Sequence, residues 1–354
     1  MVRKKREPAR SEDRWLLIRS LFEVALDFEP ELRKIFLDVA CTDLDVREEV
    51  ERLLASDENS AELLLPFELL PRVFVYADQL PVIQGYNIER LLDSGGASNV
   101  YLATSQHSGR HVAVKVCRPR AFDDQSLWRF QQECLALSKF SHPGIVQLID
   151  SGQTNGCSYL TMEFIKGKSL DAWMKESSQS VVTCIRFVRE ILCALSHVHE
   201  SGVIHRDIKP KNIMVTESGH TKIIDFGTVC MTSQDNPAGK DGHLMGTFAY
   251  MSPEQTGTCD EPIQTTSDIY QVGLILFEML AGRLPYQVNE LNVANILKAI
   301  LVQQRTRLKD VRSDLSDDLS ELVDRAVSIQ PSRRPQSAKG FKEDLELIEA
   351  GLFS

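Results

Sequence analysis

The segment His205-Arg-Asp-Ile-Lys-Pro-Lys-Asn212 decides the fold of this chain of 354 residues. It carries six charged or polar side chains and a proline between two apolar runs, Val203-Ile204 and Ile213-Met-Val215. Burying such a loop costs free energy unless its polar groups find partners or a ligand. The pattern therefore predicts a functional loop rather than a plain connection between strands.

A second acidic motif follows this loop. The run Thr221-Lys-Ile-Ile-Asp-Phe-Gly227 places Asp225 at the end of a short apolar strand. Together with Asp207 and Asn212, it supplies two carboxylates and one carboxamide at strand ends. These oxygen ligands suit Mg²⁺, which is commonly held next to phosphate groups.

The hydrophobic pattern divides the rest of the chain into a strand-rich part from Tyr86 and a mainly helical part after Gly167. This order favours two lobes. The predicted strands are 85–92, 99–103, 111–116, 145–152 and 158–164. The predicted helices are 127–140, 181–199, 267–281, 292–304, 317–328 and 337–350.

Two upstream features carry little information on their own. The Gly-containing turn at 92–100 would let backbone N–H groups approach a polyphosphate, but a plain hairpin is the commoner explanation for such a turn. Lys115 lies in the predicted strand 111–116, and a lone lysine on a strand usually faces solvent.

Taken together, five motifs make the chain resemble the eukaryotic-type (Hanks-type) serine/threonine protein kinases of bacteria. The motifs are residues 92–100, Val112-Ala-Val-Lys115, His205 to Asn212, Asp225-Phe-Gly227 and Ser252-Pro-Glu254. Their order and separations match the family. The resemblance implies an α+β bilobal protein kinase fold, with a β-rich N-lobe and a helical C-lobe, over residues 86–350.

The resemblance also implies roles for five residues near the phosphoryl group. Lys115 would hold the α- and β-phosphates of ATP and pair with Glu133. Asp207 would accept the proton of the substrate hydroxyl. Lys209 would lie near the γ-phosphate, and Thr247 matches the substrate-facing loop of serine/threonine kinases.

The nucleotide and metal ligands are implied in the same way. Asn212 and Asp225 would hold Mg²⁺. Adenine would bond to the main chain of Glu163 and Ile165 in the hinge. The phosphate loop would comprise Leu92, Asp93, Ser94, Gly95, Gly96, Ala97, Ser98 and Val100.

Further residues would support this site. The resemblance implies that Glu254 pairs with Arg334 and that Asp268 fixes the catalytic loop from a helix. Arg206 precedes the catalytic Asp207, as in kinases that a phosphate in the activation segment switches on.

The sequence departs from the family in two places. Asp93 stands where the first glycine of the phosphate loop is expected, and it adds negative charge near the phosphates. The activation segment has no Ser, Thr or Tyr between Gln234 and Gly246. The candidate phosphorylation sites are therefore Thr228, Thr232 and Ser233, with Asp241 as a permanent acid that would replace a phosphate.

The overall composition disfavours some classes of binding partner. The formal net charge of −10 argues against non-specific binding to nucleic acid or to anionic membranes. No apolar run is long enough to span a bilayer, so no membrane anchor is expected. The eight cysteines lack zinc-site spacing, which favours reduced thiols and a cytoplasmic location. We expect protein substrates, and self-association would allow autophosphorylation.

The residues before the kinase motifs form two further parts. Apolar residues at helical spacing predict three short helices in an accessory segment at 1–59, with breaks at Pro30 and Thr42-Asp43. The segment 60–85 combines three prolines with many apolar residues, which is typical of a linker that packs against something.

Two other functions are weighed against an active protein kinase. A pseudokinase would use the same fold for docking, and Asp93 would weaken its nucleotide binding. A small-molecule kinase of related fold is disfavoured because the chain carries the full segment from Gly246 to Glu254, which shapes a peptide platform in protein kinases.

Overall fold

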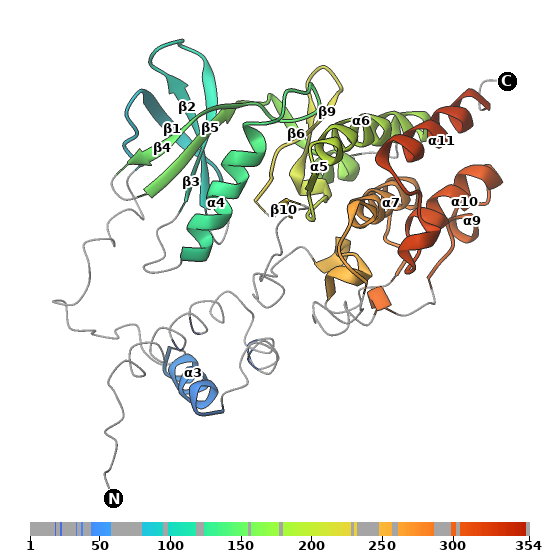
Figure 1. Cartoon of the computed structure of the whole chain (residues 1–354), viewed down its shortest axis with the longest axis horizontal. Coiled ribbons are helices and arrows are strands. Elements are labelled where there is room, and N and C mark those ends of the chain that lie inside the picture. Colours follow the sequence, from blue (N-terminus) through green and yellow to red (C-terminus); the bar gives the residue numbers. More distant parts are fainter. Residues whose placement is uncertain are drawn as a thin grey trace, which may run out of the picture. The chain divides into compact units, whose positions relative to one another are not determined.

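The structure, a computed structural model, divides the chain into two units, residues 1–74 and 75–354. It describes residues 18, 22, 33, 37, 44–57, 80–94, 98–117, 124–154, 157–176, 180–227, 230–231, 248–256, 261–286, 299–301 and 305–351. Figure 1 shows the labelled helices and strands along the chain.

The first unit has a small apolar core. Helix α3 (Leu44–Asp57) begins just after the predicted break at Thr42-Asp43. It buries Val46, Val50 and Leu54, which recur every four residues and therefore share one face of the helix. Ile18 and Leu37 belong to the same core and are helical, as the first two predicted helices require at these positions. Most of the predicted linker, residues 60–79, lies outside the described residues.

A five-stranded sheet forms the N-lobe of the second unit. Its strands are β1 (Tyr86–Ser94), β2 (Ser98–Ser105), β3 (His111–Cys117), β4 (Leu148–Thr154) and β5 (Cys157–Glu163). The spatial order is β1-β2-β3-β5-β4, and all neighbours are antiparallel. Helix α4 (Asp124–Leu137) contacts β4 and β5. The five predicted strands and the predicted helix at 127–140 are therefore present.

The strand predicted from Ile145 begins later, at Leu148. The main chain before it bonds to the C-lobe instead, since Val146 N–H donates to the carbonyl of Ile223 and Ile223 N–H donates to that of Gly144. Ile145 and Val146 are buried in the core. The apolar run reflects this burial and not a longer strand.

The C-lobe is mainly helical. Its helices are α5 (Leu170–Glu176), α6 (Val181–Glu200), α7 (Thr265–Ala281), α9 (Leu308–Val311), α10 (Asp317–Ala326) and α11 (Ala338–Gly351). Helix α6 packs against α7 and α11, and α7 also packs against α10. Of the predicted helix at 292–304, only residues 299–301 are described, and they are helical.

Short strands carry the functional loops of this lobe. Strands β6 (Gly167–Ser169), β8 (Ile213–Thr216) and β9 (Thr221–Ile223) form one sheet, and β7 (Val203–Ile204) pairs with β10 (Cys230–Met231). The loop from His205 to Asn212 therefore runs from β7 to β8, and Asp225 follows β9. Among the described residues, no helix is long and apolar enough to cross a membrane.

Candidate active site

Lys115 bonds to one carboxylate of its own lobe and to one carboxylate of the C-lobe. It lies on β3, and its Nζ is 2.7 and 2.8 Å from the two oxygens of Glu133 on α4. The same Nζ is 2.9 Å from Oδ1 of Asp225, which follows β9 in the C-lobe. The ion pair of Lys115 with Glu133 was predicted from the sequence, and the structure contains it.

Burial and charge shift the titration of this triad in opposite directions. Burial alone lowers the pKa of Lys115, but the two carboxylates outweigh it and raise this pKa well above its ordinary value. Burial raises the pKa of Glu133 to about 7, although Lys115 opposes the shift. Burial also favours neutral Asp225, yet the charge of Lys115 and its hydrogen bond lower this pKa far below the ordinary value. Asp225 is therefore ionised and can bind a cation.

The catalytic loop gathers three of the predicted residues. Lys209 Nζ lies 2.8 Å from Oδ2 of Asp207. Asn212 Nδ2 donates to the same Oδ2 and to the main-chain carbonyl of Asp207, both at 2.9 Å. The other carboxylate oxygen of Asp207, Oδ1, is buried and makes no hydrogen bond within the described part of the chain. A buried, unbonded carboxylate oxygen is ready to accept a proton from a hydroxyl group.

Helix α7 holds the main chain of this loop. Asp268 is fully buried, and its two oxygens accept the N–H groups of His205 at 2.9 Å and Arg206 at 2.8 Å. His199 on α6 also bonds to Asp268, at 2.8 Å. Arg206 has a φ of 69°, which is unfavourable for a residue with a side chain. The Asp268 bonds help to offset this cost.

The residues present fit a hard cation such as Mg²⁺. Both side-chain hydrogen bonds of Asn212 use Nδ2, which leaves the side-chain oxygen Oδ1 for a ligand. Asp225 adds an ionised carboxylate. Among the described residues no group of three or more His, Cys, Asp or Glu forms a complete metal cage. The two oxygen ligands from Asn212 and Asp225 are enough for Mg²⁺, which usually takes one or two protein oxygens and completes its shell with water and phosphate.

The hinge after β5 is fixed to both lobes. The carboxylate of Glu163 accepts the N–H of Gln147 at 3.0 Å and lies 2.5 Å from Nζ of Lys222 on β9. Glu163 also donates its own N–H to the carbonyl of Gln147. The Lys222 contact was missed in the sequence, because nothing in the local pattern of β9 indicates a partner.

Apolar side chains border the hinge. Leu92 on β1, Val100 on β2 and Ile165 after the hinge are partly buried and pack against the core that contains Ala113 and Met162. These side chains offer an apolar surface of the kind that a planar base requires.

The phosphate loop is described in part. Asp93 and Ser94 are exposed at the end of β1, and Ser98 begins β2. The carboxylate of Asp93 accepts the N–H of Ser94 at 2.9 Å. Gly95, Gly96 and Ala97 lie outside the described residues, and so do Thr228, Thr232, Ser233, Asp241 and Thr247.

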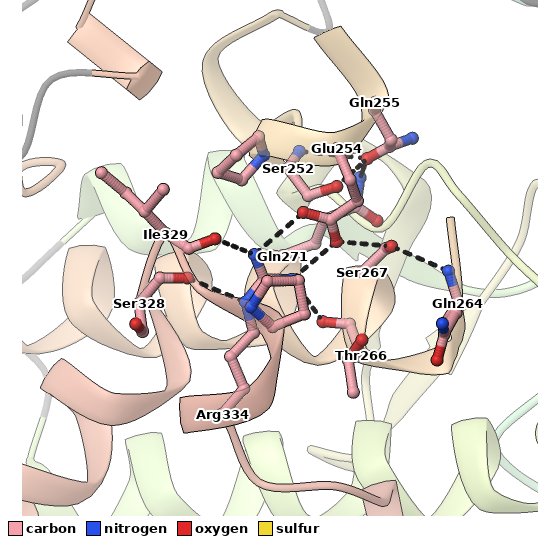
Figure 2. A network of polar contacts seen from close by, with 12 residues as sticks. Ser252, Glu254, Gln255, Gln264, Thr266, Ser267, Gln271, Ser328, Ile329 and Arg334 are labelled. Atoms are coloured by element: carbon pink, nitrogen blue, oxygen red, sulfur yellow. Dashed lines mark hydrogen bonds and ion pairs between the residues drawn. The ribbon is translucent and has the colours of Figure 1, made fainter. Parts of the chain in front are cut away.

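The predicted pair of Glu254 and Arg334 is present and fully buried. The two guanidinium nitrogens donate to the two carboxylate oxygens at 2.6 and 2.9 Å. Figure 2 shows that Ser267 also donates to Glu254, and that carbonyls of Thr266, Ser328 and Ile329 accept from Arg334. This network fixes the end of the activation segment to α7.

Known proteins are similar in sequence to this chain. The model of the protein kinase domain matches residues 86–345. Serine/threonine-protein kinase pkn3 of Myxococcus xanthus is 34% identical over 277 residues, which cover 75% of this chain and 50% of that protein. Serine/threonine-protein kinase PrkC of Bacillus subtilis is 30% identical over 265 residues, which cover 74% of this chain and 40% of that protein.

A probable serine/threonine-protein kinase PknB of Lactococcus lactis is 31% identical over 282 residues, covering 73% of this chain and 44% of that protein. The chain thus spans half or less of the length of these curated relatives. The resemblance recognised from the motifs is confirmed, and the chain belongs to the protein kinase family, with the Hanks-type serine/threonine kinases of bacteria as its relatives.

Proposed function

We propose that this protein transfers the γ-phosphoryl group of ATP to serine and threonine hydroxyls of proteins, including its own chain. The observation that carries the proposal is the arrangement around Asp207. Its unbonded Oδ1 is buried, while Lys209 and Asn212 hold the other oxygen. One carboxylate oxygen is thus fixed and the other is available for a substrate hydroxyl.

The nucleotide would be held by both lobes. Lys115, supported by Glu133, would bind the α- and β-phosphates, and the main chain at Glu163 and Ile165 would bind adenine. Asn212 and Asp225 would hold Mg²⁺, which when bound neutralises charge on the phosphates. The chain of residues 92–100 would cover the phosphates with backbone N–H groups.

The transfer itself requires position more than covalent chemistry. Asp207 would orient the substrate hydroxyl and take its proton as the oxygen attacks the γ-phosphorus, while the bond from this phosphorus to the β–γ bridging oxygen breaks and ADP leaves. Lys209 would lie beside the same γ-phosphate and stabilise the negative charge there. Holding the reacting groups in line and stabilising charge supply most of the rate enhancement in this reaction. Thr247 would face the substrate and favour an aliphatic hydroxyl.

The proposal extends to the organisation and location of the protein. Residues 86–350 would form the kinase domain, preceded by an accessory segment at 1–59 and a linker at 60–85. A cytoplasmic location remains a prediction, supported by the free thiols of Cys134, Cys184 and Cys193.

The competing proposal is a pseudokinase that docks partners. Asp93 favours it, because this exposed carboxylate lies at the edge of the phosphate loop. The chain carries every residue that an active kinase would need, which disfavours it: Lys115, Glu133, Asp207, Asn212 and Asp225.

Incubation with γ-labelled ATP, Mg²⁺ and a general protein substrate, followed by acid hydrolysis, tests the proposal. We expect labelled phosphoserine and phosphothreonine. Label only in phosphotyrosine, or nucleotide binding without labelled protein, would contradict it.

A further inference from the structure

One buried polar residue near the catalytic loop has no part in the motifs above. Gln271 is fully buried on α7, within the run Ile269-Tyr-Gln-Val-Gly-Leu-Ile-Leu276. A buried amide is costly unless both its donor and its acceptor are bonded. Two of the hydrogen bonds that satisfy the Gln271 side chain go to the residues on either side of Asp207.

The amide of Gln271 bonds to the peptide groups on both sides of Asp207. Its Oε1 accepts the N–H of Ile208 at 2.8 Å, and its Nε2 donates to the carbonyl of Arg206 at 2.9 Å. Arg206 C=O belongs to the peptide bond before Asp207, and Ile208 N–H belongs to the peptide bond after it. One side chain therefore restrains the backbone of Asp207 at two points.

A second glutamine connects this arrangement to the activation segment. Gln271 Nε2 also donates to Oε1 of Gln255, at 3.0 Å, and Gln255 Nε2 donates to the same Arg206 carbonyl at 2.7 Å. Oε1 of Gln255 further accepts the N–H and the hydroxyl of Ser252, both at 3.0 Å. Gln255 follows Ser252-Pro-Glu254, and Figure 2 includes both glutamines beside this motif.

The orientation of the amide follows from its partners. Rotating it by 180° would place Oε1 of Gln271 against two oxygens, the Arg206 carbonyl and Oε1 of Gln255. It would also place Nε2 against the N–H of Ile208. In the orientation described, both N–H groups and the oxygen of Gln271 are bonded.

Arg206 needs this support because its φ of 69° is unfavourable. The N–H groups of His205 and Arg206 donate to Asp268. The carbonyl of Arg206 accepts from Gln271 and Gln255. The backbone turn that aims Asp207 is thus fixed from α7 and from the activation segment together.

We propose that Gln271 is a positioning residue that fixes Asp207 for catalysis and, through Gln255, couples its position to the activation segment at Ser252. The proposal rests on the proposed function, in which Asp207 acts on the substrate hydroxyl. Because a small displacement of a reacting group lowers the rate strongly, the effect falls on kcat. The KM for ATP stays nearly constant, since Gln271 bonds to none of the residues assigned to the nucleotide.

The test uses the full chain and the variant Gln271→Met, which keeps the length of the side chain and removes every hydrogen bond. Leu276→Met is the matched control, because Leu276 is equally buried on the same helix and does not bond to the loop. We expect kcat to fall at least tenfold in Gln271→Met, with KM for ATP within twofold. The control keeps the wild-type kcat. A kcat within twofold of wild type in folded Gln271→Met would overturn the proposal.

Gln255→Met tests the coupling separately. We expect a smaller loss of kcat, about two- to fivefold, since one bond to the Arg206 carbonyl remains. The double variant should lose less than the product of the single losses, because part of the effect of Gln255 passes through its bond to Gln271. Multiplicative losses, or an unchanged kcat in Gln255→Met, would overturn the coupling, and the second of these outcomes is decisive even where Gln271→Met does not fold.

Amide hydrogen exchange gives a readout that does not depend on activity. We expect the Ile208 N–H to exchange at least tenfold faster in Gln271→Met than in Leu276→Met. Equal rates would overturn the restraint. If the wild type transfers no phosphoryl group, the proposed function fails, and the exchange of Ile208 still decides whether Gln271 holds the loop.

Discussion

Lys115 Nζ lies 2.9 Å from Oδ1 of Asp225, although 110 positions separate the two residues in the chain. One residue belongs to the sheet of the N-lobe and the other to the loop after β9. The contact brings Lys115, the proposed phosphate-binding residue, next to Asp225, the proposed metal ligand. The carboxylate of Glu133 on α4 forms an ion pair with Lys115. The lobes therefore meet in an arrangement that can bind a nucleotide with its metal.

Replacing Lys115 tests this arrangement. We expect Lys115→Met to lose phosphoryl transfer by at least ~10²-fold, because a fixed cation at developing negative charge supplies several kcal/mol. Lys339→Met, at an exposed lysine of α11, is the control and should retain activity. Circular dichroism checks the fold. A Lys115→Met protein with wild-type turnover would remove this residue from the site.

Asp93 should weaken ATP binding by its charge. Its carboxylate is exposed at the edge of the phosphate loop. Removing a like charge a few Å from the triphosphate is worth on the order of 1 kcal/mol at intermediate dielectric, so Asp93→Gly should lower the KM for ATP about fivefold. Asp93→Asn separates charge from backbone freedom and should show most of the effect. An unchanged or higher KM in both variants would refute the repulsion.

Arg206 requires a negative partner to settle the activation segment. Its Nε is buried and makes no hydrogen bond to any described residue. A phosphate on Thr232 or Ser233 would supply about two negative charges and three acceptor oxygens. We expect Thr232→Ala/Ser233→Ala to lose activity that incubation with ATP does not restore, and phosphatase treatment to inactivate the wild type.

The alternative for this segment is a built-in acid at Asp241. In that case Asp241→Asn alone loses activity, and phosphatase has no effect on the wild type. Full activity in the double alanine variant and in Asp241→Asn would show that neither hypothesis accounts for Arg206.

The buried pair of Glu254 and Arg334 should dominate the stability of the activation-segment end. Arg334→Met leaves a buried carboxylate without its partner and should cost about 3–5 kcal/mol in the free energy of unfolding. Combining it with Glu254→Gln should recover part of this loss. Glu343→Gln, at an exposed position of α11, should change stability by less than about 0.5 kcal/mol.

The same pair predicts a pH dependence of stability. Burial raises the pKa of Glu254, but the hydrogen bonds and charge of Arg334 outweigh it and hold this pKa below its ordinary value of 4.5. Between the lowered pKa and 4.5 the unfolded chain binds more protons, so stability falls as the pH falls through this window. In urea unfolding, the wild type should therefore have a higher free energy of unfolding than Glu254→Gln above pH 4.5, and this difference should disappear as the pH falls below 4.5. A difference that is constant with pH would refute this.

The sequence was sufficient to predict the two lobes and the contacts that the motifs define. Lys115 with Glu133, and Glu254 with Arg334, are predictable because each pair belongs to motifs whose order identifies the fold. The bonds of Gln271 to Arg206 and Ile208 were not predictable. They depend on how closely α7 approaches a loop 63 or more positions earlier in the chain, and a glutamine in an apolar helix was the only local sign.

Side-chain contacts between the lobes were equally difficult to predict from the sequence. Lys222 is an ordinary polar residue of a short strand, and only the folded chain brings it to Glu163 at the hinge. Ile145 shows the reverse case, since its apolar run indicated a strand while its neighbours bond to Ile223 in the other lobe.

Single-turnover phosphoryl transfer in wild type and Asp207→Asn tests the central claim most directly. Nucleotide binding is measured in parallel with a fluorescent ATP analogue and Mg²⁺. We predict that Asp207→Asn binds the analogue as the wild type does and loses transfer to a protein hydroxyl by ~10²–10⁴-fold, the usual contribution of a general base. Equal transfer rates in the two proteins, or binding without transfer in the wild type, would contradict the proposed function.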